Sequence, residues 1–289
     1  MSPTGTHKEA IMDDFRKRLK ETFENLYLGK NAKSVDEDFV FGKLLEVIMP
    51  NTRPMFKYRS CDEKSISAFQ NDEIYAPLAF KFNDPYDCLP YCDKERYMFL
   101  ECEDGNEICI KRSLIFNDSF DDLFDGIKNS SFVACFTEDV TSILMWSHYA
   151  DSSKGFVLQY DFKDLFLSLK AEGFLFPVIY SKERFDATGY FHSLIMGNGG
   201  NILESIISLL YKSTDWEYEK EWRAIIPGLN KLGDSFKFRC KPKAIYYGER
   251  ITNKDRNKLH EIAQEKGIEE YQMSLDHFSP NYKMTFKKL

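Results

Sequence analysis

From Met55 onward, the sequence consists of short runs of aromatic and β-branched residues separated by turns or helical stretches. These residue types favour strands, and phenylalanine, tryptophan and tyrosine together make up 15% of the 289 residues. The strand-like runs outnumber the helical stretches and lack the regular strand–helix alternation of a doubly wound sheet. We therefore expect an α+β fold, with a mixed, mainly antiparallel, split sheet surrounded by helices. The predicted strands are MFKY, EIYAP, SFVACF, GFVLQY, FLFPVIY, EWRAII, SFKFR, AIYYG, IEEYQM and YKMTF.

The first fifty residues show a different pattern. Apolar residues recur every three or four positions from Met12 to Leu26 and from Phe39 to Ile48, which is typical of amphipathic helices. The second run follows a capping-box pattern at residues 34–37, and two prolines close the section. We expect a helical extension over residues 1–54 that packs on an α+β domain over residues 55–289. A role for the extension in binding a protein partner stays open.

Composition limits the classes of function and the compartment. The formal charge of −7 argues against a generally cationic nucleic-acid binder, although a local basic groove stays open. No apolar run approaches the roughly 18 residues that span a bilayer, and the first ten residues lack the apolar core of a signal peptide. The seven cysteines include no CxxC pair, which favours free thiols over a zinc site. We expect a cytoplasmic protein with no membrane segment and no metal.

Four segments mix charged and aromatic residues, a combination that is costly to bury without a purpose. In the first, Lys57 and Arg59 flank Tyr58. In the second, residues 80–87, Asn83 and the following Asp-Pro predict a rigid turn, which accounts for Asn83 but not for Asp87. We expect a binding site to draw on both segments.

The third segment, residues 145–150, places Trp146, His148 and Tyr149 close together. These side chains offer stacking faces, a titratable imidazole and a phenol. A lone histidine is more often structural than functional, but the company of two aromatic residues favours a functional role.

The fourth segment, residues 216–223, ends in Glu219, Glu221 and Arg223. On an extended chain these three side chains project to one face. Two neighbouring carboxylates need a cation or a cationic substrate between them, and Arg59 and Arg223 are the candidate cations. The alternative is a buried arginine–carboxylate network that ties strands together.

The succession KYRS, FNDPYD, MWSHYADSSKGFVLQYD, PVIY, WEYEKEWR and AIYYG resembles the bacterial domain-of-unknown-function family 2971. The resemblance extends from about Met55 to Gly248 and leaves out the N-terminal helical section. It implies a shared site but no particular reaction.

A second, weaker resemblance is to the ADP-ribosyltransferases, whose split sheet holds NAD in a cleft. It rests on the arginine that ends the first strand, the aromatic-rich middle section and the late Glu-x-Glu before a strand. Cleavage of the nicotinamide–ribose bond creates an oxocarbenium-like ribose, which a nearby carboxylate stabilises. The resemblance implies that Glu221 is the principal electrostatic catalyst and that Glu219 positions the nucleophile of the acceptor.

The same resemblance implies a set of residues that bind NAD. Arg59 would hold the pyrophosphate or ribose, because a guanidinium can bond bidentately, and Trp146 or Tyr149 would stack on the nicotinamide. His148 joins the candidate catalytic residues, and the further candidates for NAD binding are Tyr58, Asn83, Asp87 and Arg223.

The predicted function is that of an NAD-dependent ADP-ribosyltransferase-like protein, a bacterial toxin or phage-defence effector that modifies a macromolecule or a small molecule. One alternative is a non-catalytic ligand-binding or sensor module of a defence system. Another is a nuclease that holds magnesium through Asp84, Asp87, Glu219 and Glu221.

We further predict that residues from all four segments line one concave site, because a pocket suits mixed charged and aromatic side chains better than an open surface. The residues expected to converge are Arg59, Asp87, His148, Glu219 and Arg223.

Overall fold

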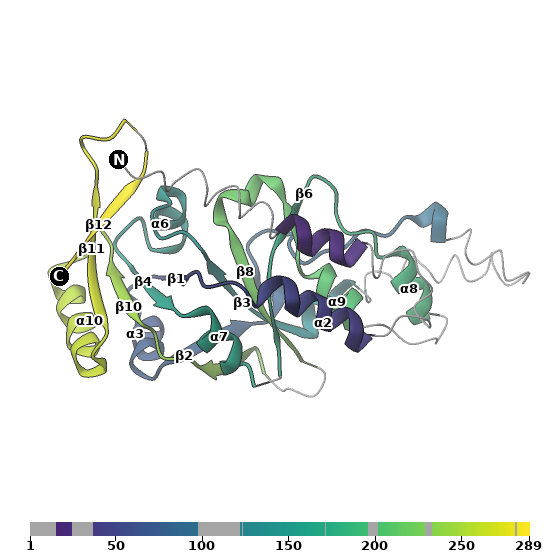
Figure 1. Cartoon of the computed structure of the whole chain (residues 1–289), viewed down its shortest axis with the longest axis horizontal. Coiled ribbons are helices and arrows are strands. Elements are labelled where there is room, and N and C mark those ends of the chain that lie inside the picture. Colours follow the sequence, from purple (N-terminus) through teal and green to yellow (C-terminus); the bar gives the residue numbers. More distant parts are fainter. Residues whose placement is uncertain are drawn as a thin grey trace, which may run out of the picture.

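The computed structural model describes residues 16–24, 37–97, 122, 124–170, 172–195, 202–228, 233–280 and 282–289. Its central sheet contains β1 (Met55–Arg59), β3 (Ser131–Thr137), β4 (Phe156–Tyr160), β5 (Phe174–Pro177), β8 (Glu221–Pro227), β10 (Ala244–Tyr247), β11 (Glu269–Leu275) and β12 (Met284–Lys288). The strand order is β12-β11-β10-β4-β1-β3-β8-β5 (Figure 1). Most of the short aromatic runs of the sequence therefore lie in one large, continuous sheet rather than in the split sheet that was predicted.

The sheet is mixed and mainly antiparallel. Neighbouring strands run antiparallel except β10 and β11, which are parallel and are joined by the helix α10 (Asn253–Lys266). This helix begins after Thr252, whose side chain accepts a hydrogen bond from the amide of Asp255, and it ends at Gly267 with a φ of 62°. With helices around the sheet, the predicted α+β class is confirmed.

Two further pairs of strands lie outside the main sheet. One pairs β2 (Glu73–Pro77) with β9 (Ser235–Arg239), and the other pairs β6 (Ile179–Ser181) with β7 (Tyr211–Ser213). The run FLFPVIY, predicted as one strand, divides between β5 and β6, because Pro177 ends the pairing with β8 and Ile179 pairs with Tyr211 of β7. The short strand β7 was not predicted.

The other helices are α2 (Glu37–Ile48), α3 (Glu63–Gln70), α6 (Ile143–Tyr149), α7 (Phe162–Ser168), α8 (Thr188–Ile195) and α9 (Ile202–Ser208), with 3₁₀ turns η2 (Ala79–Lys81) and η3 (Thr214–Glu219). Residues 16–24, 94–97 and 124–129 are also helical. Of the capping box predicted at residues 34–37, residues 34–36 lie outside the described residues. Among the described helices, none has the length and apolar character needed to cross a membrane.

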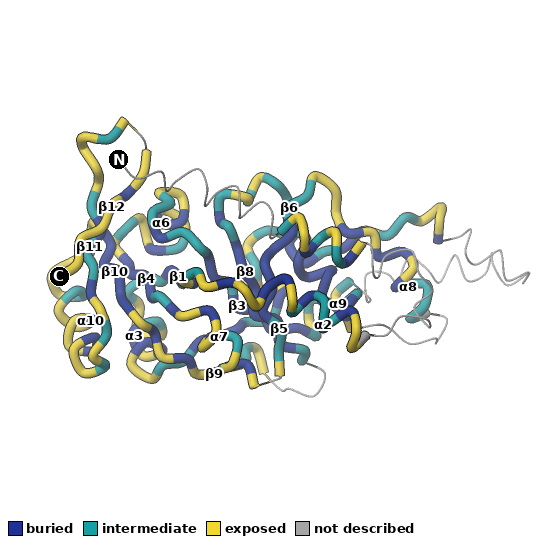
Figure 2. The backbone as a smooth tube through the Cα atoms, viewed as in Figure 1, coloured by how far each residue is buried: buried dark blue, intermediate teal, exposed yellow. Residues whose placement is uncertain are grey.

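The two faces of the sheet are covered by different helices. On one face, Phe56, Tyr58 and Val157 pack with Trp146 of α6. On the other face, the strands pack with α3 and α10 in the main core. Figure 1 shows α6 and α3 on opposite sides of β1 and β4. In Figure 2 the central strands are largely buried, whereas α10 and β12 carry much of the exposed surface.

The described part of the N-terminal section contacts the β5 end of the sheet. Phe23 lies edge-on to Phe176, with ring centroids 6.4 Å apart, and Phe41 of α2 lies 5.4 Å from Phe174. Arg16 donates to the carbonyl oxygens of Val178 and Glu221 at 2.6 and 2.9 Å. These helices share the main core with the sheet, while the boundary after residue 54 stays a prediction.

Candidate functional site

The end of β1 carries Arg59 into a cleft. Successive side chains of a strand point to opposite faces, so Lys57 and Arg59 lie on the face opposite Phe56 and Tyr58. β1 pairs with β4 from its first residue to its last, but its register with β3 joins Phe56 to Thr137 only. The last residues of β1 therefore border a space that β3 does not fill.

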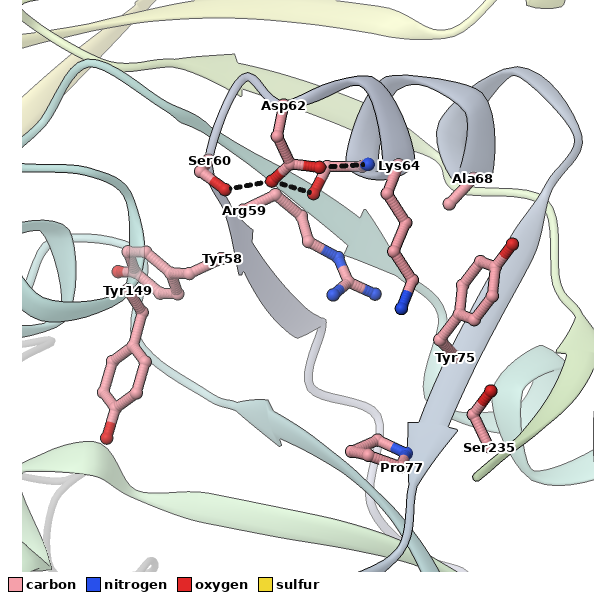
Figure 3. Close-up of a pocket in the computed structure, with 11 residues that line it drawn as sticks. Tyr58, Arg59, Ser60, Asp62, Lys64, Ala68, Tyr75, Pro77, Tyr149 and Ser235 are labelled. Carbon is pink, nitrogen blue, oxygen red and sulfur yellow. Dashed lines mark hydrogen bonds between the residues drawn. The ribbon is translucent and has the colours of Figure 1, made fainter. Parts of the chain in front are cut away.

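This space, which we call the Arg59 cleft, has a volume of about 330 Å³ and is shown in Figure 3. Its walls come from the end of β1, from α3, from the paired strands β2 and β9, and from α6. In Figure 3 the guanidinium of Arg59 and the ammonium of Lys64 point into the same space, with Tyr75 facing them. The cleft thus combines cations with an aromatic ring.

Arg59 is the central residue of the cleft. Within the described ranges, no hydrogen bond or ion pair joins its side chain to another residue, and Figure 3 shows none. Burial lowers the pKa of Arg59, which the nearby Tyr160 and Asp62 only partly offset. Arg59 is partly buried, and a guanidinium that is partly removed from water without an anionic partner is unfavourable, so an anionic ligand would stabilise it.

The carboxylate of the cleft, Asp62, is already engaged. It caps α3 by accepting a hydrogen bond from the amide of Ser65 at 2.8 Å, and the hydroxyls of Ser60 and Ser65 also donate to it. The ammonium of Lys64, also on α3, lies 4.8 Å from the ring centroid of Tyr75. Among the residues that line the cleft, the cations are Arg59 and Lys64 and the carboxylate is Asp62. Cations therefore outnumber carboxylates around the cleft.

A tight turn fixes the segment after α6 against β1. Asp151, Ser152 and Ser153 have φ values of 45°, 54° and 67°, a left-handed conformation that costs free energy in residues other than glycine. The turn leads to Gly155, where an added Cβ would lie 2.0 Å from the carbonyl oxygen of Arg59. Only glycine allows this approach, so the turn and the end of β1 are held together.

A second group of charged side chains, which we call the ion cluster, consists of Asp87, Lys212, Glu219, Glu221 and Arg223. All five are buried, and Arg223 is 0% exposed. Arg223 donates to both oxygens of Asp87 at 2.7 and 2.8 Å and to Glu221 at 2.8 Å. Lys212 donates to Glu219 at 2.6 Å and to Glu221 at 2.8 Å. The contacts form a network that ties β7, η3, β8 and residue 87 together.

The ion cluster contains three carboxylates and two cations. One negative charge is therefore not balanced by a cation of the cluster. Burial alone would raise the pKa of Glu221, but Arg223 and Lys212 hold it well below its usual value. Burial and the charge of Glu221 raise the pKa of Glu219. Among the carboxylates of the cluster, Glu219 is therefore the better candidate to exchange a proton.

The geometry of residues 219–223 differs from the predicted extended chain. Glu219 is the last residue of η3, and Lys220 adopts a left-handed conformation with a φ of 46°. Only Glu221 and Arg223 lie on β8, two residues apart and therefore on one face. The prediction of an extended chain is wrong for Glu219, yet the turn at Lys220 still brings Glu219 to the same cluster. The predicted cation Arg59 is not among the ion-pair partners of these carboxylates, which are Lys212 and Arg223.

Tyr149 connects the Arg59 cleft to the ion cluster. It lines the cleft, and its hydroxyl donates to Oε1 of Glu219 at 2.6 Å. The other oxygen of Glu219 accepts from Lys212. Burial and this hydrogen bond raise the pKa of Tyr149, so its phenol keeps its proton at neutral pH.

The remaining predicted site residues lie in different surroundings. Tyr58 lines the cleft and donates its hydroxyl to the carbonyl of Asp139 at 2.8 Å. Trp146 is 0% exposed and donates to the carbonyl of Val140, so it has no free face for a nicotinamide. His148 and Asn83 are exposed, and the ring of His148 lies 6.3 Å from that of Tyr149.

The five residues predicted to converge are thus divided. Asp87, Glu219 and Arg223 meet in the buried ion cluster, Arg59 lies in the adjoining cleft, and His148 lies on the surface beside Tyr149. Their roles in catalysis or NAD binding stay predictions.

The predicted magnesium ligands do not surround a vacant centre. The ammonium of Lys212 lies 2.6, 2.8 and 3.5 Å from oxygens of Glu219, Glu221 and Asp87. The described ranges contain no group of three or more histidine, cysteine or acidic side chains that could hold a metal ion. Lys212 therefore lies where the nuclease alternative would place a magnesium ion.

Two functional candidates were missed from the sequence. Lys212 lies seven residues before Glu219. Because a 3₁₀ turn lies between them, neither the period of a strand nor that of a helix predicts that the two side chains meet. Lys64 lies on the exposed side of α3 and looks like an ordinary surface lysine. One sequence signal could have identified Lys64. It lies five residues after Arg59 and follows Asp62, the residue that caps α3.

Comparison with known proteins gives a match to one family model over part of the chain. No curated protein and no solved structure matches the chain. Residues 145–224 match the model of the family described as protein of unknown function (DUF2971). The matched segment contains Tyr149 and four residues of the ion cluster, whereas Arg59 and Asp87 lie before it. Over residues 145–224, the match confirms the resemblance to this family that the sequence motifs predicted.

Proposed function

We propose that the protein binds a phosphorylated, ring-containing ligand in the Arg59 cleft, and that NAD is the first ligand to test. The observation that carries this proposal is the guanidinium of Arg59, which points into the cleft and has no hydrogen-bond or ion-pair partner among the described residues. A guanidinium recognises phosphate oxygens through paired, charge-assisted hydrogen bonds.

The surroundings of Arg59 fit the same ligand class. Lys64 adds a second positive charge, the hydroxyls of Ser60 and Ser235 add polar groups, and Tyr75 and Tyr149 add aromatic rings. The chain as a whole has a formal charge of −7, so the cationic cleft is not part of a generally basic surface. A volume of about 330 Å³ is within the usual range for small-molecule sites.

The experiment is a thermal-shift comparison of the wild-type protein with NAD, ADP-ribose, inorganic phosphate and nicotinamide, without added metal. A ligand that binds the folded state stabilises it by about 2.7 kcal/mol at a hundred times its Kd. We expect NAD and ADP-ribose to raise the Tm and nicotinamide to leave it unchanged, because the phosphates provide the main contact. A shift with nicotinamide alone, or no shift with any phosphorylated ligand, would contradict the proposal.

ADP-ribosyl transfer is the second candidate function, and the hydrogen bond from Tyr149 to Glu219 favours it. In that reaction the nicotinamide–ribose bond breaks, nicotinamide leaves with the bonding electrons, and an acceptor nucleophile bonds to the ribose carbon. Glu221 is occupied by Arg223 and Lys212, whereas Glu219 is joined to a residue of the cleft wall. Glu219, acting through Tyr149, is therefore a better candidate than Glu221 to stabilise the positive charge on the ribose.

The test is nicotinamide release from NAD with candidate acceptors from cell lysate, measured for wild type, Glu219→Gln and Glu221→Gln. If Glu219 is the catalyst, Glu219→Gln lowers the rate about a hundredfold or more while NAD affinity changes little. Unfolding curves of both variants separate a catalytic loss from a loss of folded protein. If the wild-type protein binds NAD without releasing nicotinamide, the proposed binding function is retained and the proposed transferase activity is contradicted. The acceptor and the toxin or defence setting stay predictions.

A further inference from the structure

A second cavity lies on the other side of the ion cluster. It has a volume of about 360 Å³ and is formed by the segment after η2, by β6 and β7 with the residues that follow β6, and by η3. Lys212 of the ion cluster lines it, and the ammonium of Lys212 lies 5.0 Å from the ring centroid of Trp216. We call this space the Trp216 cavity. It shares no lining residue with the Arg59 cleft.

Three aromatic rings line the walls of the Trp216 cavity. Trp216 is partly exposed, Tyr86 is 65% exposed, and Tyr211 completes the aromatic lining. The guanidinium of Arg184 lies 5.5 Å from the ring of Tyr86 and holds that ring at the cavity edge. Exposed rings around a cavity of this size provide stacking surfaces for a flat ligand.

Charged residues of both signs line the Trp216 cavity. The carboxylates are Asp84, Glu183 and Asp215, and the cations are Lys182, Arg184 and Lys212. Asp84 accepts one hydrogen bond from the amide of Tyr86, and Asp215 accepts one from the hydroxyl of Ser213. Each carboxylate can accept further hydrogen bonds, and Arg184 can donate several. Lys212 is already paired with the carboxylates of the ion cluster, which leaves Lys182 and Arg184 as the cations that face the three carboxylates. Because the lining offers hydrogen-bond donors as well as acceptors, it favours a neutral ligand that has both at its edge.

We infer that the Trp216 cavity binds a neutral, planar heteroaromatic ring with hydrogen-bonding edges, of which a nucleobase carried by a nucleoside is the natural example. The ring stacks on Trp216, and its edge meets the carboxylates and Arg184. This site is distinct from the Arg59 cleft, and the inference does not depend on the function proposed for that cleft. The two spaces are connected through the ion cluster, because Glu219 accepts hydrogen bonds from both Tyr149 and Lys212.

Intrinsic fluorescence reports on this site directly. The chain has three tryptophans, of which Trp146 and Trp222 are 0% and 1% exposed and Trp216 is partly exposed. Titration of the wild-type protein with adenosine, guanosine, cytidine and uridine should quench the Trp216 emission in a saturable way for at least one nucleoside. The absence of saturable quenching up to the solubility limit of all four nucleosides overturns the inference.

Variants then locate the binding by calorimetry. Trp216→Ala and, separately, Tyr86→Ala should each weaken nucleoside binding about tenfold or more, because each removes a stacking face. Trp216→Phe should retain most of the affinity, and Arg59→Ala should leave it unchanged. Binding that survives both alanine variants overturns the inference, as does an equal loss in Arg59→Ala, which would place the nucleoside in the Arg59 cleft. If NAD does not bind the Arg59 cleft, the nucleoside-binding measurements on these variants can still be interpreted.

Discussion

Tyr149 donates its hydroxyl proton to Glu219 across 2.6 Å, and this contact joins the Arg59 cleft to the ion cluster. The two residues are 70 positions apart in the chain and belong to different elements, α6 and η3. A ligand that contacts Tyr149 is therefore one hydrogen bond away from the buried charges.

Removal of this hydrogen bond should destabilise the fold. Tyr149→Phe leaves one oxygen of a buried carboxylate without its donor, and hydrogen bonds to charged groups contribute roughly 1.5–3 kcal/mol. Tyr218→Phe is the matched control, since within the described residues the Tyr218 hydroxyl makes no hydrogen bond. Chemical unfolding at pH 7 measures both variants, and an equal, small effect would show that the Tyr149 contact is not formed.

Lys212 should be indispensable to the ion cluster. Lys212→Met leaves three buried carboxylates with Arg223 as the single cation, and loss of one partner from a buried ion pair costs roughly 3–5 kcal/mol. Lys258→Met on the exposed side of α10 should change the free energy of unfolding by about 0.5 kcal/mol or less. Urea unfolding with a constant m-value would measure the difference. A Lys212→Met protein as stable as wild type would mean that the carboxylates are protonated in the folded state.

Two glycine substitutions should act in opposite directions. Gly155→Ala places a Cβ 2.0 Å from the carbonyl oxygen of Arg59, so it must displace the end of β1 and should lower both stability and ligand affinity. Gly42→Ala in α2 meets no atom within 4 Å and should stabilise the protein by roughly 0.5–1 kcal/mol through helix propensity. Thermal unfolding of the two variants checks the signs. A stable Gly155→Ala would contradict the close approach of the turn to β1.

Lys57 should make stability depend on pH above neutrality. Burial, with a further contribution from Arg59, lowers the pKa of Lys57 from 10.5 to about 7, although Cys135 and Glu221 oppose the shift. Its ammonium position is fixed by a hydrogen bond of 2.8 Å to the carbonyl of Cys135. Between pH 7 and 10.5 the unfolded chain therefore holds one proton more than the folded protein at this residue.

The free energy of unfolding of wild type should consequently rise with pH in this window relative to Lys57→Met. The expected slope of the difference is about 1.4 kcal/mol per pH unit. Denaturant unfolding of both proteins from pH 7 to pH 10 measures it. A difference that stays constant over the window would show that Lys57 has an ordinary pKa.

The sheet and one helix could be predicted well from the sequence because their signals are local. Thr252 and Gly267, residue types that favour the two ends of a helix, cap α10, and the aromatic runs at β1, β2 and β9 are strands. The helix α6 was not predicted because its buried residues, Met145 and Trp146, are adjacent and give no period over seven residues. The strand β7 has three residues and forms only because β6 pairs with it.

The candidate site could be predicted only in part, because its organisation depends on contacts between distant segments. The mixed charged and aromatic segments pointed to Arg59, Asp87, Tyr149 and Arg223, all of which lie in the cleft or the ion cluster. Sequence patterns could not show that the side chain of Trp146, a residue of α6, is buried in the core. They also could not show that Lys212, from β7, supplies the cation between the carboxylates.

Calorimetric titration of NAD into wild type and Arg59→Gln tests whether Arg59 binds the phosphates of the ligand. Arg239→Gln, on the exposed side of β9, is the control. Arg59→Gln removes the charge that faces the cleft and should weaken binding about tenfold or more, in line with hydrogen bonds to charged groups. Arg239→Gln should bind like wild type, and added salt should weaken binding to wild type more than binding to Arg59→Gln. Equal affinities of wild type and Arg59→Gln for NAD would contradict the account.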